Sequence, residues 1–177
     1  MLLSEYPDHR KIVRRERYVF IQPKLNGWRA YANTKTGEIF SRSGRELDLP
    51  HISTAIKAAC REGSPEWIDG ELYRQGSTLG EIQSMIKKQD DRLQFHIFDC
   101  MIDKGFFDRS SILKAQFNFQ YVSLIPVETH VVHHKEIMRY YKNYLNHGYE
   151  GAVVRIDGRP YEQHRSFQAL KMTPEIM

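Results

Sequence analysis

The chain has 177 residues, of which 41% are hydrophobic and 27% charged, and its formal net charge is +4 with a pI near 9.0. This composition is typical of a globular domain and excludes a disordered chain. No apolar run reaches the length of about 18 residues that spans a membrane, and the charged N-terminus lacks the apolar core of a signal peptide. The basic surplus favours a polyanionic partner such as nucleic acid.

The two cysteines, Cys60 and Cys100, are too few for a disulfide framework, so we expect free thiols and a cytoplasmic or intracellular location. The sequence has no internal repeat, low-complexity tract or linker, and we interpret residues 1–177 as a single domain. No coiled-coil pattern indicates an oligomer, and we expect a monomer.

In chain order, alternating apolar residues predict strands over 18–22, 28–33 and 38–42, with a turn at 34–37. We interpret these three strands as an antiparallel meander.

The middle of the chain alternates between helix and strand patterns. Pro50 begins a predicted helix with an apolar stripe, and residues 67–73 form the next strand. Thr78 is the predicted N-cap of another helix, with Glu81 at the capping-box position. Alternating residues over 93–101 predict a further strand.

The last third of the chain follows the same pattern. A weaker helix over 108–119 precedes an extended segment, 122–132, in which Pro126 indicates an edge strand. A strong helix over 134–148 has an apolar stripe, and two strands close the chain at 151–156 and 167–172. The stripe consists of Ile137, Met138, Tyr141, Tyr144 and Leu145. The fold class is therefore α+β, with mostly antiparallel sheet and flanking helices.

Several common sites are excluded by the absence of their motifs, among them the P-loop, the GxSxG nucleophile and paired CxxC zinc ligands. A histidine cluster, His130, His133 and His134, could suggest a metal. Because the first two lie on opposite faces of an extended segment, we interpret the cluster as surface residues.

Lys24 lies at the end of a predicted strand, where a lysine is unexpected. Later strand-like segments contribute two carboxylates, Glu71 and Glu150, an aromatic ring, Phe98, and a second lysine, Lys171. Magnesium is commonly bound by one or two carboxylates together with substrate phosphates, and a nucleobase stacks well on an aromatic ring. Each acid lies beside a glycine, which we interpret as room for a ligand near the backbone. Together these residues indicate a nucleotide site.

The segment PKLNGWR (23–29) resembles the Lys-x-Asp-Gly-x-Arg signature of covalent nucleotidyltransferases, which comprise ATP-dependent DNA ligases, RNA ligases and mRNA capping enzymes. Five further segments match the remaining motifs of these enzymes in order and cover nearly the whole chain. They are SRSGRE (41–46), DGELY (69–73), FHIFDC (95–100), EGAVVR (150–155) and LKM (170–172). The resemblance implies an ATP-grasp-like nucleotidyltransferase domain.

The resemblance implies a role for each motif residue. Lys24 would attack the α-phosphorus of ATP and hold AMP covalently, and Leu25 would line the same cofactor site. Gln22 would read adenine and Phe98 would stack on it. Arg29, Arg42 and Arg45 would bind ribose, phosphate or DNA. Glu71 would bind the ribose and the metal, and Glu150 would bind Mg²⁺ or Mn²⁺. Lys171 would bind the α-phosphate.

The implied function is an ATP-dependent DNA ligase core that seals nicks in duplex DNA during repair and replication. Three positions depart from the usual motifs: Asn26 replaces Asp, Thr173 replaces a second lysine, and Gln22 replaces Glu. The resemblance implies a C-terminal OB-fold domain in a complete ligase, and we expect that domain to be absent from this chain. Two alternatives stay open: an RNA ligase or capping-type enzyme, and a degenerate nucleic-acid-binding module.

Overall fold

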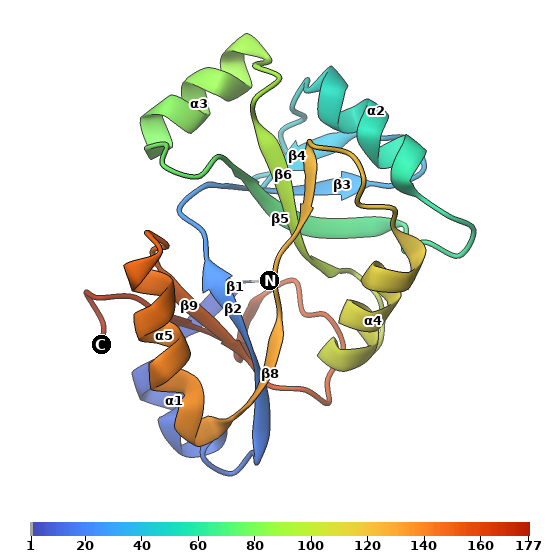
Figure 1. Cartoon of the computed structure of the whole chain (residues 1–177). Helices are drawn as coiled ribbons and strands as arrows, with labels where there is room; N and C mark the ends of the chain where they lie inside the picture. The colour runs from blue at the N-terminus through green and yellow to red at the C-terminus, as the bar shows by residue number, and fades with distance from the viewer. Residues whose placement is uncertain (1) are drawn as a thin grey trace. The chain divides into compact units, whose positions relative to one another are not determined.

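The computed structural model describes residues 2–177, which form two compact units, each built on a five-stranded sheet (Figure 1). Unit 1 consists of Met1–Leu25, Asp103–Phe106 and Glu128–Met177, and unit 2 consists of Asn26–Ile102 and Phe107–Val127. Most strand pairs in both sheets are antiparallel, so the predicted α+β fold class is confirmed.

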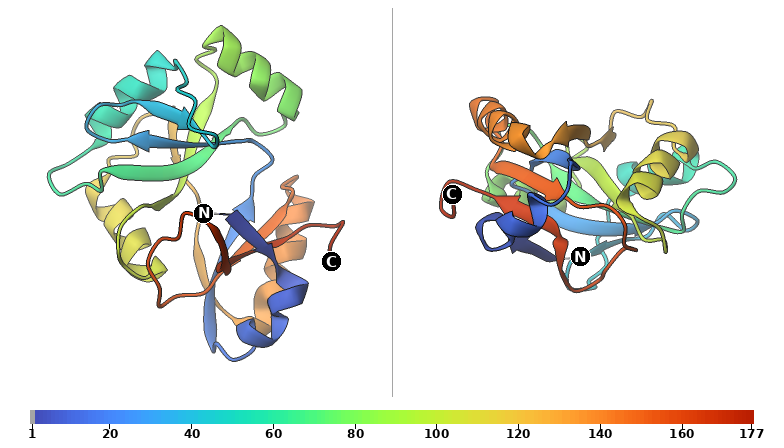
Figure 2. Two further views of the ribbon diagram at one scale, coloured as in Figure 1. Left: turned by 180° about the vertical axis from the view of Figure 1, so that it is seen from behind. Right: turned by 90° about the horizontal axis from the view of Figure 1, so that it is seen from below.

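The sheet of unit 1 has the strand order β1-β10-β9-β2-β8, with β1 parallel to β10 and all other pairs antiparallel. Its strands are β1 (Leu2–Glu5), β2 (Tyr18–Lys24), β8 (His130–His133), β9 (Gly151–Arg155) and β10 (Arg165–Met172). Its helical elements are α1 (Tyr6–Val13), the 3₁₀ helix η1 (His134–Glu136) and α5 (Ile137–Asn146). Figure 2 shows this part of the fold from two further sides.

The core of unit 1 forms where α1 and α5 cover one face of this sheet. Val19 and Ile21 of β2 are buried there against Tyr141 and Tyr144 of α5. Because strand side chains alternate, Phe20, Gln22 and Lys24 lie on the opposite face. The predicted stripe of α5 is right except at Met138, which is 41% exposed.

The sheet of unit 2 has the order β4-β3-β5-β6-β7. Its strands are β3 (Trp28–Asn33), β4 (Ile39–Ser41), β5 (Trp67–Tyr73), β6 (Gln94–Cys100) and β7 (Leu124–Pro126), and its helices are α2 (Pro50–Ala59), α3 (Leu79–Lys88) and α4 (Phe106–Gln116). β7 lies at the sheet edge, as Pro126 predicts. The capping box of α3 is also confirmed, because the Thr78 hydroxyl accepts from the Glu81 N–H and the Glu81 carboxylate accepts from the Thr78 N–H.

The predicted meander is wrong at its first connection. β2 pairs with β8 and β9, whereas β3 pairs with β4 and β5 in the other sheet. Both hydrogen-bonding edges of β2 are thus occupied by strands distant in sequence, so residues 25–27 link two sheets instead of forming a hairpin. Only the β3–β4 part of the meander is confirmed.

The N-terminal elements β1 and α1 were not predicted from the sequence. Many of their residues are charged, so neither helix nor strand periodicity stands out. No helix in the described part of the chain is long and apolar enough to cross a membrane.

Candidate active site

Lys24 is the last residue of β2, and its amine is held by the carboxylate of Glu150, the residue before β9. The Lys24 Nζ lies 2.5 Å from Glu150 Oε2, with the side chains 18% and 30% exposed. The backbone fixes this pair, because the Glu150 N–H donates to the Lys24 carbonyl at 3.1 Å and Lys24 lies opposite Gly151 in the β2–β9 register. The amine is therefore accessible and has a proton acceptor within reach.

Two motif glycines are required by the packing of neighbouring strands. A Cβ on Gly151 would lie 1.9 Å from the Met172 carbonyl oxygen. A Cβ on Gly27 would lie 2.5 Å from the Leu72 carbonyl oxygen and 2.6 Å from the Glu71 side chain. We expected Gly151, beside Glu150, to leave room for a ligand near the backbone. At both Gly151 and Gly27, however, the close approach is made by a neighbouring strand of the protein.

Three of the residues proposed from the sequence share one face of the unit 1 sheet. Gln22 lies opposite Val153 in β9, which lies opposite Lys171 in β10, and paired residues point to the same side. Lys24 is two residues beyond Gln22 and points to this side as well. Leu25 follows directly and is buried.

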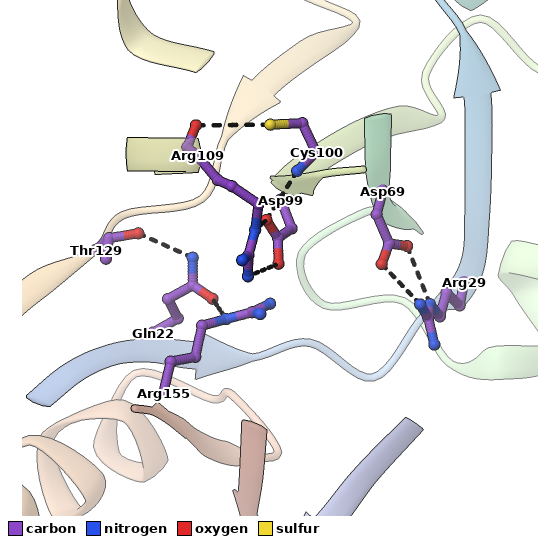
Figure 3. A network of polar contacts seen from close by, with 8 residues as sticks. All are labelled: Gln22, Arg29, Asp69, Asp99, Cys100, Arg109, Thr129 and Arg155. Carbon is purple, nitrogen blue, oxygen red and sulfur yellow. Dashed lines mark hydrogen bonds and ion pairs between the residues drawn. The ribbon is translucent and has the colours of Figure 1, made fainter. Parts of the chain in front are cut away.

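Gln22 is buried and takes part in a hydrogen-bond network that was not predicted. Its side-chain amide donates to the Thr129 hydroxyl at 2.8 Å and accepts from the Arg155 Nε at 2.7 Å (Figure 3). The Arg155 guanidinium in turn lies 4.6 Å from the centre of the Phe106 ring. These bonds orient the amide that the sequence assigns to adenine recognition.

Lys171 is paired with Glu5 of β1 at 3.3 Å. Close by, Glu175 accepts a hydrogen bond from Thr173, which holds the pKa of this carboxyl below its ordinary value, and the charges of Lys24 and Lys171 act in the same direction. Thr173, one of the positions that depart from the expected motif, thus places an acid near both lysines.

In unit 2, a cavity of about 470 Å³ gathers Arg29, Arg42 and Glu71. Its remaining lining residues are Gly27, Trp28, Ser41 and Ser43. Arg29 reaches it from β3 and Glu71 from β5, directly opposite in the register. Arg45 is exposed at the end of the same 41–45 turn, where its N–H donates to the Ser41 hydroxyl at 3.2 Å, but it does not line the cavity.

Phe98 is half-buried in β6 at the point where the β5–β6 register shifts, between the pairs Gly70–Ile97 and Asp69–Asp99. His96 of the same strand lies opposite Glu71. Burial lowers the pKa of His96 to about 4, so this imidazole is neutral near neutral pH. Asp99 lies opposite Asp69 and forms a fully buried pair with Arg109 at 2.7 Å. A second pair, between Arg29 and Asp69, is bidentate at 3.0 and 2.6 Å (Figure 3).

The two thiols agree with the sequence analysis. Cys60 and Cys100 are free, and burial raises the pKa of Cys100 to about 12. Among residues 2–177, no three His, Cys, Asp or Glu side chains are grouped as a metal site, the histidine cluster included. Magnesium can nevertheless be held by one or two carboxylates and substrate phosphates.

The family model of the ATP dependent DNA ligase domain matches residues 1–172. The chain belongs to this family. It is 31% identical over 160 residues to a DNA ligase of Haemophilus influenzae, a match that covers 84% of the chain and 55% of that relative. It is 28% identical over 158 residues to a DNA ligase of African swine fever virus, covering 80% of the chain and 37% of the relative. The chain thus spans about half the length, or less, of these curated relatives.

Solved structures of DNA ligases have the same fold. A Lig E DNA ligase has a TM-score of 0.75 at 20% identity, covering 98% of this chain and 67% of that one. The bacteriophage T7 ligase in complex with ATP has a TM-score of 0.70 at 16% identity, covering 99% and 68%. The Chlorella virus DNA ligase-adenylate has a TM-score of 0.68 at 22% identity, covering 88% and 60%. The predicted nucleotidyltransferase fold is confirmed.

Proposed function

We propose that the chain is the adenylation domain of an ATP-dependent DNA ligase, which transfers AMP to Lys24 and then seals nicks in duplex DNA. The observation that carries this proposal is the Lys24–Glu150 pair in a chain of this family. The Lys24 side chain lies at a strand end and is 18% exposed, so a substrate can reach it. A Glu150 carboxylate oxygen lies 2.5 Å from its amine and can accept the proton.

In the first step, the Lys24 nitrogen would attack the α-phosphorus of ATP. A P–N bond forms, the P–O bond to pyrophosphate breaks, and the amine loses a proton. A protonated amine has no free electron pair, so deprotonation must precede attack, and Glu150 is the acceptor within hydrogen-bond distance.

The other residues would bind and orient the nucleotide. We assign adenine recognition to Gln22 from its place in the motif, and the Thr129 and Arg155 bonds fix the orientation of its amide. Phe98 would stack on the base, and Glu71 would bind the ribose hydroxyls. Lys171 would bind the α-phosphate, for which its 31% exposed side chain is available.

The described residues offer no group of three protein ligands for a metal, so most ligands of a divalent ion would come from the substrate. Glu150 and Glu71 are the carboxylates that would contribute to holding Mg²⁺ or Mn²⁺, with ATP phosphates completing the coordination. Such a metal would neutralise phosphate charge during displacement. Each carboxylate also has protein partners, so neither depends on a metal to be satisfied.

The proposed macromolecular partner is nicked duplex DNA, in repair or replication. Arg42 and Arg45 are the proposed DNA contacts, and both are exposed. The free thiols are consistent with an intracellular location, which we include in the proposal. We further propose that the chain acts as a monomer and that a complete ligase also uses an OB-fold domain.

The first test measures covalent labelling of the chain by ATP. After incubation with α-labelled ATP and Mg²⁺, the wild-type chain should retain label under denaturing conditions, and Lys24→Ala should retain none. Lys142→Ala, which removes an exposed lysine of α5, is the matched control and should label normally. Labelling of Lys24→Ala at the wild-type level would contradict the assignment.

The alternatives are separated by the substrates. Labelling from GTP in preference to ATP would indicate a capping-type enzyme, and sealing of nicked RNA in preference to nicked DNA would indicate an RNA ligase. Absence of both labelling and sealing, with DNA binding retained, would indicate the degenerate module. Pre-adenylated nicked DNA should be sealed without ATP, so this arm tests the last step alone.

A further inference from the structure

The positive charge of this protein is concentrated in one short segment. Unit 1 contains 14 Lys and Arg against 10 Asp and Glu, whereas unit 2 contains 12 of each. Within unit 1, residues 9–17 (HRKIVRRER) contain five Lys and Arg against one acid, Glu16. This segment alone therefore accounts for a surplus as large as that of the whole chain.

Two arginines of this segment, Arg10 and Arg14, line a cavity of about 620 Å³ in unit 1, which we name the basic pocket. Its lining residues are Tyr6, Arg10, Arg14, His134, Lys135, Met138 and Met177. Arg10 of α1 and Arg14, the residue that caps its C-terminal end, are four residues apart and lie on the same side, and Lys135 comes from η1. None of the lining residues has an acidic side chain.

The cations of the basic pocket are not neutralised by the protein. In the part of the chain that the structure describes, no carboxylate lies within 4 Å of the charged nitrogens of Arg10, Arg14 or Lys135. Partial burial lowers the pKa of the neighbouring His133, and the charges of His134 and Lys135 lower it further, as expected in a positive local potential. Like charges that converge without counterions repel one another, and an anion would relieve this repulsion.

The floor of the basic pocket is apolar and suits a sugar-phosphate chain better than a free ion. Tyr6 lies below the Arg10 guanidinium, which is 5.8 Å from the ring centre, and Met138 is 41% exposed at the pocket. The volume is large for a single phosphate group. Arginine and lysine provide several N–H donors for phosphate oxygens, which receive most of the hydrogen bonds between proteins and DNA.

We propose that the basic pocket binds backbone phosphates of duplex DNA without regard to sequence, at a site separate from the residues assigned to ATP. The identity of the polyanion rests on the proposed ligase function. The basic pocket contributes affinity and orientation, and it takes no part in adenylation.

The test measures the salt dependence of DNA binding. A triple variant, Arg10→Gln, Arg14→Gln and Lys135→Gln, is compared with wild type by fluorescence anisotropy on a labelled nicked duplex over a series of KCl concentrations. Each lost phosphate contact reduces the slope of log K against log salt by about 1, so we expect a reduction of about 3 in magnitude. The triple variant should lose the same factor of DNA affinity for duplexes of different sequence.

The matched control removes the same charge elsewhere. Lys87→Gln, Lys88→Gln and Lys114→Gln change exposed lysines of α3 and α4 and should leave the slope within about 0.5 of wild type, less than the loss of one contact. An equal reduction in both triple variants would overturn the proposal, because net charge alone would then account for it. An unchanged slope in the pocket variant would also overturn it. The double variant Arg14→Gln, Lys135→Gln spares the Arg10–Tyr6 contact and should reduce the slope by about 2.

Adenylation separates this proposal from the proposed function. All of these variants should label from ATP like wild type, because none changes a residue assigned to ATP. Failure of wild type to label would refute the ligase function, while a pocket-specific change in salt slope would still establish DNA binding by the basic pocket. Loss of labelling in the pocket variant alone would contradict a purely DNA-binding role.

Discussion

The two units differ in how far their main ion pairs are exposed to solvent and in their balance of acidic and basic residues. In unit 2, Asp99 and Arg109 form a pair whose side chains are 0% and 2% exposed, and acids balance bases over the whole unit. In unit 1, Lys24 and Glu150 form a pair with 18% and 30% exposure, and basic residues are in surplus. A fully buried pair cannot reach a substrate, whereas a partly exposed pair can exchange its partner for one. We infer that the pair in unit 2 specifies structure and the pair in unit 1 is available for chemistry.

The largest expected effect is the loss of the buried pair. Arg109→Ala leaves the Asp99 carboxylate buried without its cation and should lower the free energy of unfolding by about 3–5 kcal/mol. Both tryptophans, Trp28 and Trp67, lie in unit 2, so their fluorescence in urea follows this unit. The double variant Asp99→Leu, Arg109→Met should be more stable than Arg109→Ala. A cost below about 1 kcal/mol, the value of an exposed pair, would remove the contrast between the units.

Acid should also destabilise unit 2 through His96. Burial holds the pKa of His96 at about 4 in the folded chain, compared with about 6.5 when unfolded, so the unfolded state binds the proton more tightly. The stability that depends on neutral His96 is complete above pH 6.5 and is lost as the pH falls toward 4, by about 3 kcal/mol. Urea unfolding at several pH values should show a shallower dependence for His96→Gln. Parallel curves for the two proteins would show that His96 does not titrate in this way.

Gly27 tests how closely the Lys24 motif packs on β5. A Cβ here would meet the Leu72 carbonyl oxygen at 2.5 Å, so Gly27→Ala should cost about 1–3 kcal/mol from overpacking and should slow AMP labelling. Gly80→Ala is the matched control, since a Cβ at this position of α3 meets no atom within 4 Å. It should stabilise the chain by about 0.5–1 kcal/mol. Similar thermal midpoints for the two variants would contradict the close approach.

The smallest expected change in stability accompanies the largest loss of activity. Lys24→Met removes a partly exposed ion pair, which should change the free energy of unfolding by less than about 1 kcal/mol. Circular dichroism in urea measures this change, with Lys142→Met as the control. A loss of several kcal/mol would mean that the Lys24–Glu150 pair is structural, like the pair in unit 2.

Local patterns in the sequence predicted the elements well. Alternation in β6 and the capping box of α3 involve residues a few positions apart, so their physical causes are visible in the sequence itself. The order of the motifs likewise predicted the nucleotidyltransferase fold. Within unit 1, Gln22, Lys24 and Lys171 share a sheet face, and within unit 2, Arg29, Arg42 and Glu71 line one cavity.

Long-range pairing could not be predicted in this way. The partners of Gln22 are Thr129 and Arg155, which are 107 and 133 residues away, and no local pattern connects them. The same limit explains the wrong meander, because β8 and β9 take the two edges of β2 only after the chain has folded back. Arg109 was missed because an arginine in a weakly amphipathic helix looks like a surface residue until Asp99 is placed beside it.

The most direct test of the central claim locates the adenylate on the chain. Wild-type protein incubated with ATP and Mg²⁺ is digested, and the peptides are sequenced by tandem mass spectrometry. The account predicts one added AMP on the peptide that contains PKLNGWR, at Lys24, and no AMP on any peptide of Lys24→Arg. Adenylate found on another lysine, or retained in Lys24→Arg, would contradict the account.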